Sequence, residues 1–271
     1  MTSHTWFPAG PALLFAPADR PERFGKAAQR ADVVILDLED GCRPENRTQA
    51  RANIAATDLD PERTIVRINP ADSPDHAEDL AALKKTPFRT VMLPKAESAS
   101  QIAALHGFDV IALCETPRGV LNALDIASAD NLVAMFWGAE DLTAALGGTH
   151  SRDSTGTYRD VARYARAHVH LAAAAQGVSA LDSVHVDIAD VDGLRAEADD
   201  AAALGYVGTC CIHPSQVAII RQAYRPTDEQ IEWATGLLEA AKDNSGAFSF
   251  AGQMVDAPLV SQAEAILRRA V

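Results

Sequence analysis

Three short apolar runs in this chain each end in or next to acidic residues: VVILDLED (Val33 to Asp40), VIALCET (Val110 to Thr116) and LVAMFWGAED (Leu132 to Asp141). None of them alternates apolar with polar residues, so each predicts a parallel strand that helices cover on both faces. A carboxylate at the end of such a strand is costly unless a partner stabilises it. The acids at these strand ends are therefore candidate site residues.

The rest of the chain alternates strand-like with helix-like segments. The predicted strands are residues 12–18, 33–40, 64–70, 90–96, 110–116, 132–141, 183–189 and 208–214. The predicted helices are residues 21–30, 45–56, 75–85, 98–106, 120–128, 158–176, 191–204 and 215–224. Eight such pairs are the number that closes a (β/α)8 barrel, which commonly takes about 250 residues.

We therefore predict the α/β class, with a (β/α)8 TIM barrel over residues 1–224 and a C-terminal helical extension over residues 225–271. This tail is surplus to a barrel, so we expect it to cover a face, the mouth or a neighbouring subunit. The polar, glycine-bearing segment from Gly147 to Gly156 predicts a loop over the barrel mouth.

Composition excludes several classes of function. A net charge of -13 and a pI near 5.0 provide no electrostatic footprint for nucleic acid or for an anionic membrane surface. The four cysteines, two of them adjacent at Cys210 and Cys211, form neither a disulfide framework nor a spaced metal site. No secretory leader and no apolar run of about 20 residues is evident, so we expect a cytoplasmic protein with no membrane partner.

The carboxyl ends of all the strands in a barrel face the same mouth. Five acids follow predicted strands and are expected to converge there: Glu39, Asp40, Glu115, Glu140 and Asp141. Glu115 and Asp141 stand on separate strands, and two carboxylates plus waters suit Mg²⁺, for which Mn²⁺ could substitute. The alternative is that one carboxylate pairs with an arginine or caps a helix.

Two cations lie at the same strand ends. Arg67 in VRIN could hold substrate oxygens in a forked geometry, or it could form an internal ion pair with Asp37, Glu39 or Asp40. Lys95 in MLPKAES could supply a Schiff base. Several acids crowd the same mouth, however, so we expect a charged Lys95 paired with Asp40 or a neighbouring acid.

Histidines also occur near predicted strand ends. His185 and Asp187 alternate along the predicted strand 183–189, so they could form a catalytic or metal-binding pair. His213 ends the last predicted strand. For each histidine, the alternative is a hydrogen-bonded packing residue.

In its ordered motifs the chain resembles the citrate lyase beta-subunit-like family, within the wider malyl-CoA lyase group of TIM-barrel enzymes. The resemblance runs from about Leu13 to Gln262. It rests on LFAPADRPERFGKA, VVILDLEDG, VRIN, VMLPKAES, ET-x-x-G, WGAEDL, SVHVDIADVDGL, CIHPSQ and GQMVDAP.

This resemblance implies a role for each candidate residue. Glu115 and Asp141 would bind Mg²⁺, and Arg67 would contact the substrate oxygens. The residues that would lie along coenzyme A are Phe15, Arg20, Lys26, Ile212, His213 and Pro214, and the supporting residues are Glu39, Asp40, Lys95 and Glu140. Asp256 would act as acid/base from the tail of an adjacent subunit in a homotrimer.

The function expected from the resemblance is a Mg²⁺-dependent carbon–carbon lyase. It would cleave a 3-hydroxyacyl-CoA of the malyl, citramalyl, citryl or 3-hydroxy-3-methylglutaryl type by retro-Claisen chemistry, giving acetyl-CoA or a homologue and a carbonyl acid. One alternative is a metal-dependent aldolase that acts on a free pyruvate-derived hydroxy acid, although Arg20 and Lys26 favour the CoA interpretation. Another is a beta-type subunit that is active only with acyl-carrier partners.

Overall fold

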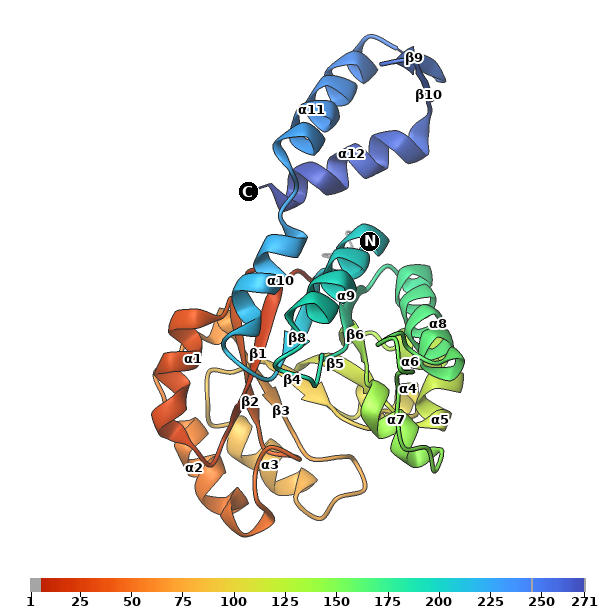
Figure 1. The fold of residues 1–271 in the computed structure, drawn as a ribbon. Coiled ribbons are helices and arrows are strands. Elements are labelled where there is room, and N and C mark those ends of the chain that lie inside the picture. Colours follow the sequence, from red (N-terminus) through yellow and green to blue (C-terminus); the bar gives the residue numbers. More distant parts are fainter. Residues whose placement is uncertain (1–5, 245, 271) are drawn as a thin grey trace. The chain divides into compact units, whose positions relative to one another are not determined.

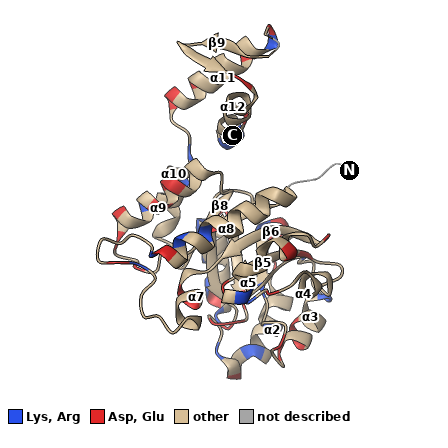
Figure 2. Cartoon of the chain, turned by 90° about the vertical axis from the view of Figure 1, so that its right-hand side faces the viewer, with Lys and Arg blue, Asp and Glu red and all other residues tan. Residues whose placement is uncertain are grey.

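A computed structural model describes residues 6–244 and 246–270 of the chain (Figure 1). The chain divides into two compact units, one that ends at Ile220 and one that begins at Arg221. Within the described residues, no helix is long and apolar enough to cross a membrane. Lys and Arg residues lie among Asp and Glu residues on the barrel helices (Figure 2).

Eight parallel strands close into a barrel in sequence order, which confirms the predicted (β/α)8 fold. They are β1 (Ala12–Pro17), β2 (Val33–Asp37), β3 (Thr64–Arg67), β4 (Thr90–Leu93), β5 (Asp109–Cys114), β6 (Leu132–Trp137), β7 (Ser179–Asp182) and β8 (Gly208–Cys211). The last strand pairs with the first, with Leu13 opposite Cys210. Because the barrel is closed, its strands leave no open edge.

Helices surround this barrel in Figure 1. The α-helices are α1 (Phe24–Arg30), α2 (Arg47–Ala56), α3 (His76–Leu83), α4 (Ala99–Ala103), α5 (Pro117–Leu121), α6 (Ala123–Ala127), α7 (Ala139–Ala145), α8 (Asp160–Gln176), α9 (Val191–Leu204) and α10 (Gln216–Tyr224). Short 3₁₀ turns precede α1, α2 and β3: η1 (Pro21–Arg23), η2 (Pro44–Asn46) and η3 (Pro61–Arg63). Each begins with proline, whose fixed φ suits a first helical position.

The barrel interior explains why the strands read as continuous apolar runs. All five residues of β2 are buried. Apolar side chains from every strand pack in the interior: Leu13, Val33, Ile35, Ile65, Met92, Ile111, Leu113, Ala134, Phe136, Leu181 and Cys210. Helices cover the outer face of the same strands, so little polar alternation remains in the sequence.

Two predicted strands differ from the observed ones. β7 ends at Asp182, so the predicted strand 183–189 is wrong. Its alternating pattern does not correspond to a buried face, because Val186 and Ile188 are exposed. β6 ends at Trp137, and α7 then begins at Ala139 inside the run that was predicted to be strand.

The second unit is a small helix–hairpin–helix module. It comprises α11 (Asp228–Lys242), the antiparallel hairpin of β9 (Phe248–Phe250) and β10 (Gln253–Val255), and α12 (Ala257–Arg269). Leu237, Val255 and Ala263 are buried in its own apolar cluster. A helical extension was predicted here, but the three-residue hairpin strands are too short to give a periodic signal.

Candidate functional site

A cavity of about 880 Å³ opens at the carboxyl ends of the barrel strands. Its lining includes residues from the ends of seven strands or from the loops that follow them: Phe15, Asp37, Asp40, Arg67, Glu115, Glu140, Asp141, Ser183, Val184, Ile212, His213 and Pro214. The acids predicted to converge do so here, although Glu39 reaches the site through ion pairs and is not itself a lining residue. The site therefore combines residues that are far apart in the sequence.

Asp37 and Arg67 form the central ion pair of the site. They end adjacent strands and stand opposite each other in the β2–β3 register. Arg67 donates from Nε to Asp37 Oδ1 at 2.7 Å and from Nη2 to Oδ2 at 2.5 Å. The backbone N–H groups of Glu39 and Gly41 also donate to Asp37, so the turn after β2 folds around this carboxylate.

Arg67 also faces the cavity. Its side chain is 12% exposed, and its Nη1 lies 2.9 Å from Glu39 Oε2. The guanidinium lies over the Phe15 ring, 4.8 Å from the ring centroid. The guanidinium has five N–H donors, and Asp37 accepts from only two of them. The internal ion pair and a role at substrate oxygens are therefore compatible.

Lys95 lies between two acids of the turn after β2 and one acid of α7. Its ammonium pairs with Glu39 and lies 3.9 Å from both Asp40 Oδ2 and Asp141 Oδ1. Burial alone would lower the pKa of Lys95, but the hydrogen bond and charge of Glu39 raise this pKa above its ordinary value. The expected ion pair is present, and it holds the amine in the protonated state that cannot form a Schiff base.

Glu115 follows β5 directly and is 3% exposed. Burial, and then the negative charges of Asp141 and Glu39, raise the pKa of Glu115 to about 8. The backbone N–H of Lys95, a residue with φ of 52°, donates to Glu115 Oε1 at 3.1 Å. A Cβ at Gly138 would lie 2.8 Å from the Cβ of Glu115, so only glycine fits where β6 passes this carboxylate.

Cys114 immediately precedes Glu115 at the end of β5. Burial, and then the charge of Glu115, raise the pKa of the Cys114 thiol to about 12. The other three cysteines, Cys42, Cys210 and Cys211, are also buried free thiols. Burial, and then the charge of Asp19, raise the pKa of Cys42 to about 11.

Asp141 stands in the first turn of α7, and its side chain is 40% exposed. Acids are favoured at this position because the helix dipole is positive at its N-terminus. Among residues 6–244 and 246–270, no three His, Cys, Asp or Glu side chains form a ready metal cluster. Two carboxylates whose charges repel each other would still fit Mg²⁺, which takes few protein ligands and keeps several waters.

A row of cations lines the cavity from the first helical segment: Arg23, Lys26 and Arg30. Sequence analysis singled out Lys26 but missed both arginines, although the i, i+3, i+7 spacing of the three places them on one helical face. Arg20 is not a lining residue; it is half-exposed and lies 3.9 Å from Asp19.

The loop after β8 forms another part of the cavity wall, with Ile212, His213 and Pro214. Gln216 fixes this loop, because its Oε1 accepts from the backbone N–H groups of Ile212 and His213 at 3.0 and 3.1 Å. Its Nε2 donates to the backbone carbonyl of His185 at 2.7 Å, which links the loops after β7 and β8. Sequence analysis did not single out this buried glutamine.

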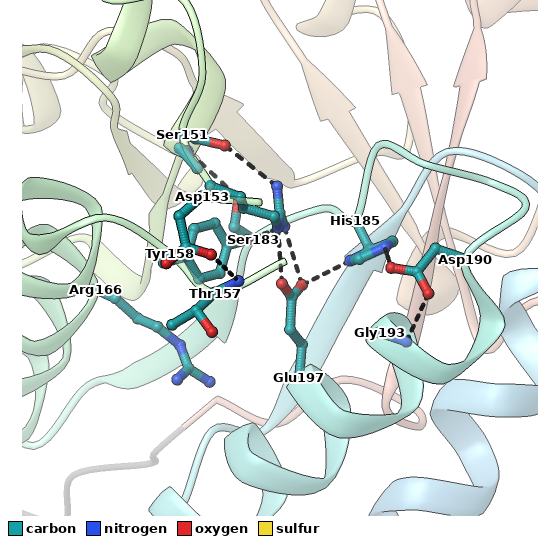
Figure 3. Close-up of polar contacts among 12 residues, drawn as sticks. Ser151, Asp153, Thr157, Tyr158, Arg166, Ser183, His185, Asp190, Gly193 and Glu197 are labelled. Atoms are coloured by element: carbon teal, nitrogen blue, oxygen red, sulfur yellow. Dashed lines mark hydrogen bonds and ion pairs between the residues drawn. The ribbon is translucent and has the colours of Figure 1, made fainter. Parts of the chain in front are cut away.

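His185 is a packing residue of the loop after β7, and it does not line the cavity (Figure 3). Its Nδ1 lies 2.9 Å from Glu197 Oε2, and its Nε2 lies 3.2 Å from Asp190 Oδ2. Of the two alternatives for His185, the structure has the hydrogen-bonded packing residue; Asp187 is exposed and accepts from the backbone N–H of Ala189.

Asp256 belongs to the second unit, where it is the N-cap residue of α12. Its side chain is half-buried and makes no capping hydrogen bond. The carboxylate is therefore not used to cap its own helix.

We expect stability to respond to the protonation of His185. The hydrogen bond to Glu197 raises the pKa of His185 above the ordinary value of 6.5. The stability that this pair contributes is therefore fully present below pH 6.5 and is lost as the pH rises through the higher folded-state pKa. Urea unfolding of the wild type and of His185→Gln across this range checks the prediction. A stability difference that stays constant with pH would contradict it.

Comparisons with known proteins agree with this geometry. A protein-family model described as HpcH/HpaI aldolase/citrate lyase matches residues 12–214. A citrate lyase subunit beta-like protein of Mycobacterium tuberculosis is 58% identical over 262 residues, which cover 97% of this chain and 96% of that protein. The mitochondrial citramalyl-CoA lyase of Mus musculus is 32% identical, over 98% of this chain and 87% of that protein.

A solved structure is similar over almost the same span. It is the protein CitE from Mycobacterium tuberculosis in complex with magnesium, acetoacetate and coenzyme A. It is 58% identical to this chain, with a TM-score of 0.91, and the match covers 97% of this chain and 98% of that one.

Proposed function

The chain belongs to the HpcH/HpaI aldolase/citrate lyase family, and from that premise we propose that it is a Mg²⁺-dependent carbon–carbon lyase that cleaves a 3-hydroxyacyl-CoA. The products would be acetyl-CoA or a homologue and a carbonyl acid. The observation that carries this proposal is the arrangement of one cavity, in which the Glu115 and Asp141 carboxylates share the lining with the guanidinium of Arg67.

Arg67 is suited to the difficult species of a retro-Claisen reaction. When the carbon–carbon bond breaks, its electron pair passes into the thioester unit and forms an enolate. A fixed positive group near the enolate oxygen stabilises this charge without having to reorganise. Asp37 and Glu39 hold the guanidinium in place, and the remaining N–H donors would serve the substrate.

Glu115 and Asp141 would hold Mg²⁺. When bound, the ion would polarise the oxygens of the departing carbonyl acid. The two carboxylates come from separate strand ends, and Lys95 balances part of their charge from the other side. Burial is the main cause of the raised pKa of Glu115, and a divalent cation would relieve the part that repulsion from Asp141 adds.

The cationic helical face supports coenzyme A as the carrier. Arg23, Lys26 and Arg30 provide local positive charge in a chain whose net charge is -13. Such a row is suited to phosphate groups. The residues after β8 would contact the less polar part of the same arm. A free pyruvate-derived hydroxy acid would leave this row without a partner.

Asp256 would transfer a proton to or from the α-carbon of the acetyl-CoA fragment, from the tail of an adjacent subunit in a homotrimer. Support for this role comes from the family resemblance of the GQMVDAP motif and from the absence of a capping bond on its side chain.

The test is release of free acetyl-CoA from malyl-, citramalyl-, citryl- and 3-hydroxy-3-methylglutaryl-CoA by the purified protein, with Mg²⁺ and again with EDTA. We expect metal-dependent cleavage of at least one of these thioesters. If a folded, Mg²⁺-binding protein cleaved none of them, two other hypotheses would become better. One is an aldolase that acts on a free acid, and the other is a beta-type subunit that requires acyl-carrier partners. An assay for pyruvate release from a free 4-hydroxy-2-oxo acid, which an aldolase cleaves to a pyruvate enolate and an aldehyde, separates those two.

Replacement of Glu115 tests the metal site. With a pKa of about 8, Glu115 must lose a proton before it can bind a cation at neutral pH, so Mg²⁺ affinity should rise up to about pH 8 and then level off. Glu115→Gln should weaken Mg²⁺ binding by at least the roughly 10- to 100-fold that loss of an outer-shell partner costs. Isothermal titration of metal-free protein at several pH values measures both effects.

Glu97→Gln is the matched control for that experiment. Glu97 follows β4 and accepts a hydrogen bond from Thr116, but it does not line the cavity. Its replacement should leave Mg²⁺ affinity unchanged. Equal losses in the two variants would remove Glu115 from the metal site.

Arg67→Lys tests the role of the guanidinium. Lysine keeps the positive charge but cannot reproduce the forked contact with Asp37 or the fixed donors to the substrate. We expect kcat to fall roughly 10²- to 10³-fold, as for the loss of one oxyanion donor, with Mg²⁺ affinity retained. Steady-state kinetics and metal titration check this pair of expectations, and a kcat near that of the wild type would refute the assignment.

A further inference from the structure

The segment between α7 and α8, residues 146–159, is not part of the cavity wall. Among the described residues, those that line the cavity include none from this segment, and the expectation that it lies over the barrel mouth stays a prediction. It packs instead against the first turn of α7 and against α9 through Arg152, whose side chain is 13% exposed.

Arg152 binds two acids from different helices. Its Nε and Nη2 donate to Glu197 Oε1 and Oε2 of α9 at 2.9 and 3.0 Å. Its Nη1 donates to Glu140 Oε1 of α7 at 3.2 Å. The guanidinium lies 4.0 Å from the centroid of the Tyr158 ring and donates to the Tyr158 hydroxyl. Arg152 therefore connects α7 to α9.

The α9 side of this connection is itself fixed. His185 lies between Glu197 and Asp190, and Asp190 also caps α9 by accepting from the backbone N–H of Gly193 at 2.9 Å (Figure 3). The bidentate pair with Glu197 therefore sets the direction of the Arg152 guanidinium.

The α7 side depends on this connection. The N-cap residue of α7 is Gly138, which has no side chain with which to cap the helix. The first-turn carboxylate of Glu140 accepts from Ser151 Oγ at 2.6 Å as well as from Arg152. The backbone N–H of Ala139 has only a long bond, 3.4 Å, to Ser183 Oγ. The hydrogen bonds from Ser151 and Arg152 to Glu140 thus help to fix the position of the first turn of α7.

Asp141 is the next residue of the same turn. Its carboxylate lies 3.9 Å from the Lys95 ammonium, which is too long for a hydrogen bond. The position of the Asp141 carboxylate is therefore set by the backbone of α7 more than by its own contacts. Tyr158, on which Arg152 stacks, also packs edge to face on Trp137, the last residue of β6 before Gly138, with ring centroids 5.2 Å apart.

We propose that Arg152 is a positioning residue for the metal site: through Glu140 it fixes the first turn of α7 and thereby the carboxylate of Asp141. This inference rests on the proposed function in one respect, since it takes Asp141 as a metal ligand. Arg152 does not line the cavity, so its effect would be on how well the Asp141 carboxylate is preorganised before a cation binds.

The experiment measures Mn²⁺ binding to the metal-free full-length protein by electron paramagnetic resonance. Arg152→Met keeps the apolar stem and removes the donors. We expect it to weaken Mn²⁺ binding by about 10-fold, the lower end of the cost of losing an outer-shell partner. In the lyase assay, the Mg²⁺ concentration for half activation should rise by the same factor, while kcat at saturating Mg²⁺ stays close to the wild-type value.

Arg166→Met is the matched control. Arg166 is 15% exposed, pairs with the two acids Asp182 and Asp200, and lies over the ring of Tyr206. Neither acid belongs to α7. Its loss should reduce thermal stability comparably but leave Mn²⁺ affinity unchanged. Equal losses of affinity in the two variants would overturn the proposal, because they would indicate a general effect of removing a buried arginine.

Two milder variants decide the matter if Arg152→Met does not fold. Ser151→Ala removes the 2.6 Å hydrogen bond to Glu140 and the 3.3 Å bond that Ser151 Oγ accepts from Arg152 Nη1, but it keeps the Arg152 guanidinium. It should therefore weaken Mn²⁺ binding in the same direction but by less. Arg152→Lys should produce no further loss of affinity in a Glu140→Gln background, because the two residues act through one contact. Unchanged affinity in Ser151→Ala together with additive losses in the double variant would overturn the proposal.

The wild type separates this inference from the proposed function. If wild-type protein binds no Mn²⁺, the proposed metal site fails, and the premise of the inference fails with it. If the wild type binds Mn²⁺ and Arg152→Met binds it equally well, the inference alone fails.

Discussion

An alternation of charge at the barrel mouth makes the rest of this site possible. Three ion pairs link anions and cations alternately: Asp37 with Arg67, Arg67 with Glu39, and Glu39 with Lys95. At the end of a strand that is buried on both faces, a desolvated carboxylate stays charged at low cost where it meets an opposite charge. These pairs come from β2, the turn after it, β3 and the loop after β4, so the parallel pairing of neighbouring strands brings the partners together.

The carboxylates beyond this chain of pairs are not compensated in the same way. Lys95 and Arg67 offset only part of the charge of Glu115, and burial, together with repulsion from Asp141, raises the pKa of Glu115. The Asp141 carboxylate lies 3.9 Å from the Lys95 ammonium. Gly138 lets β6 pass close to Glu115, so the backbone keeps the two acids near each other despite this cost. A site of this kind is built for a ligand that brings positive charge.

Much of this architecture could be predicted from the sequence, because its signals are local. The continuous apolar run of β2 follows from burial on both faces, and the convergence of Asp40, Glu115 and Asp141 follows from the geometry of a parallel barrel. The strand prediction for residues 183–189 was wrong because it rested on periodicity alone. Val and Ile alternate there with polar residues at the period of a strand, although Val186 and Ile188 are exposed.

The side-chain network around Arg152 could not be predicted in this way. Arg152 and Glu197 are separated by 45 residues, and no periodicity relates an arginine in a loop to a glutamate on a later helix. Pairing of this kind is decided by which helices become neighbours after closure of the barrel. Arg23 and Arg30 of the cationic helical face could have been predicted, because their helical spacing relative to Lys26 is visible in the sequence.

The burial of every thiol has a chemical consequence for a protein proposed to handle thioesters. A thiolate beside an acyl-CoA would take the acyl group by transthioesterification and block the site. Only the thiolate is the effective nucleophile, so a thiol whose pKa lies near 11 or 12 is inert at neutral pH. Cys114, one residue from Glu115, is thus kept from self-acylation by the same burial that raises the pKa of its neighbour.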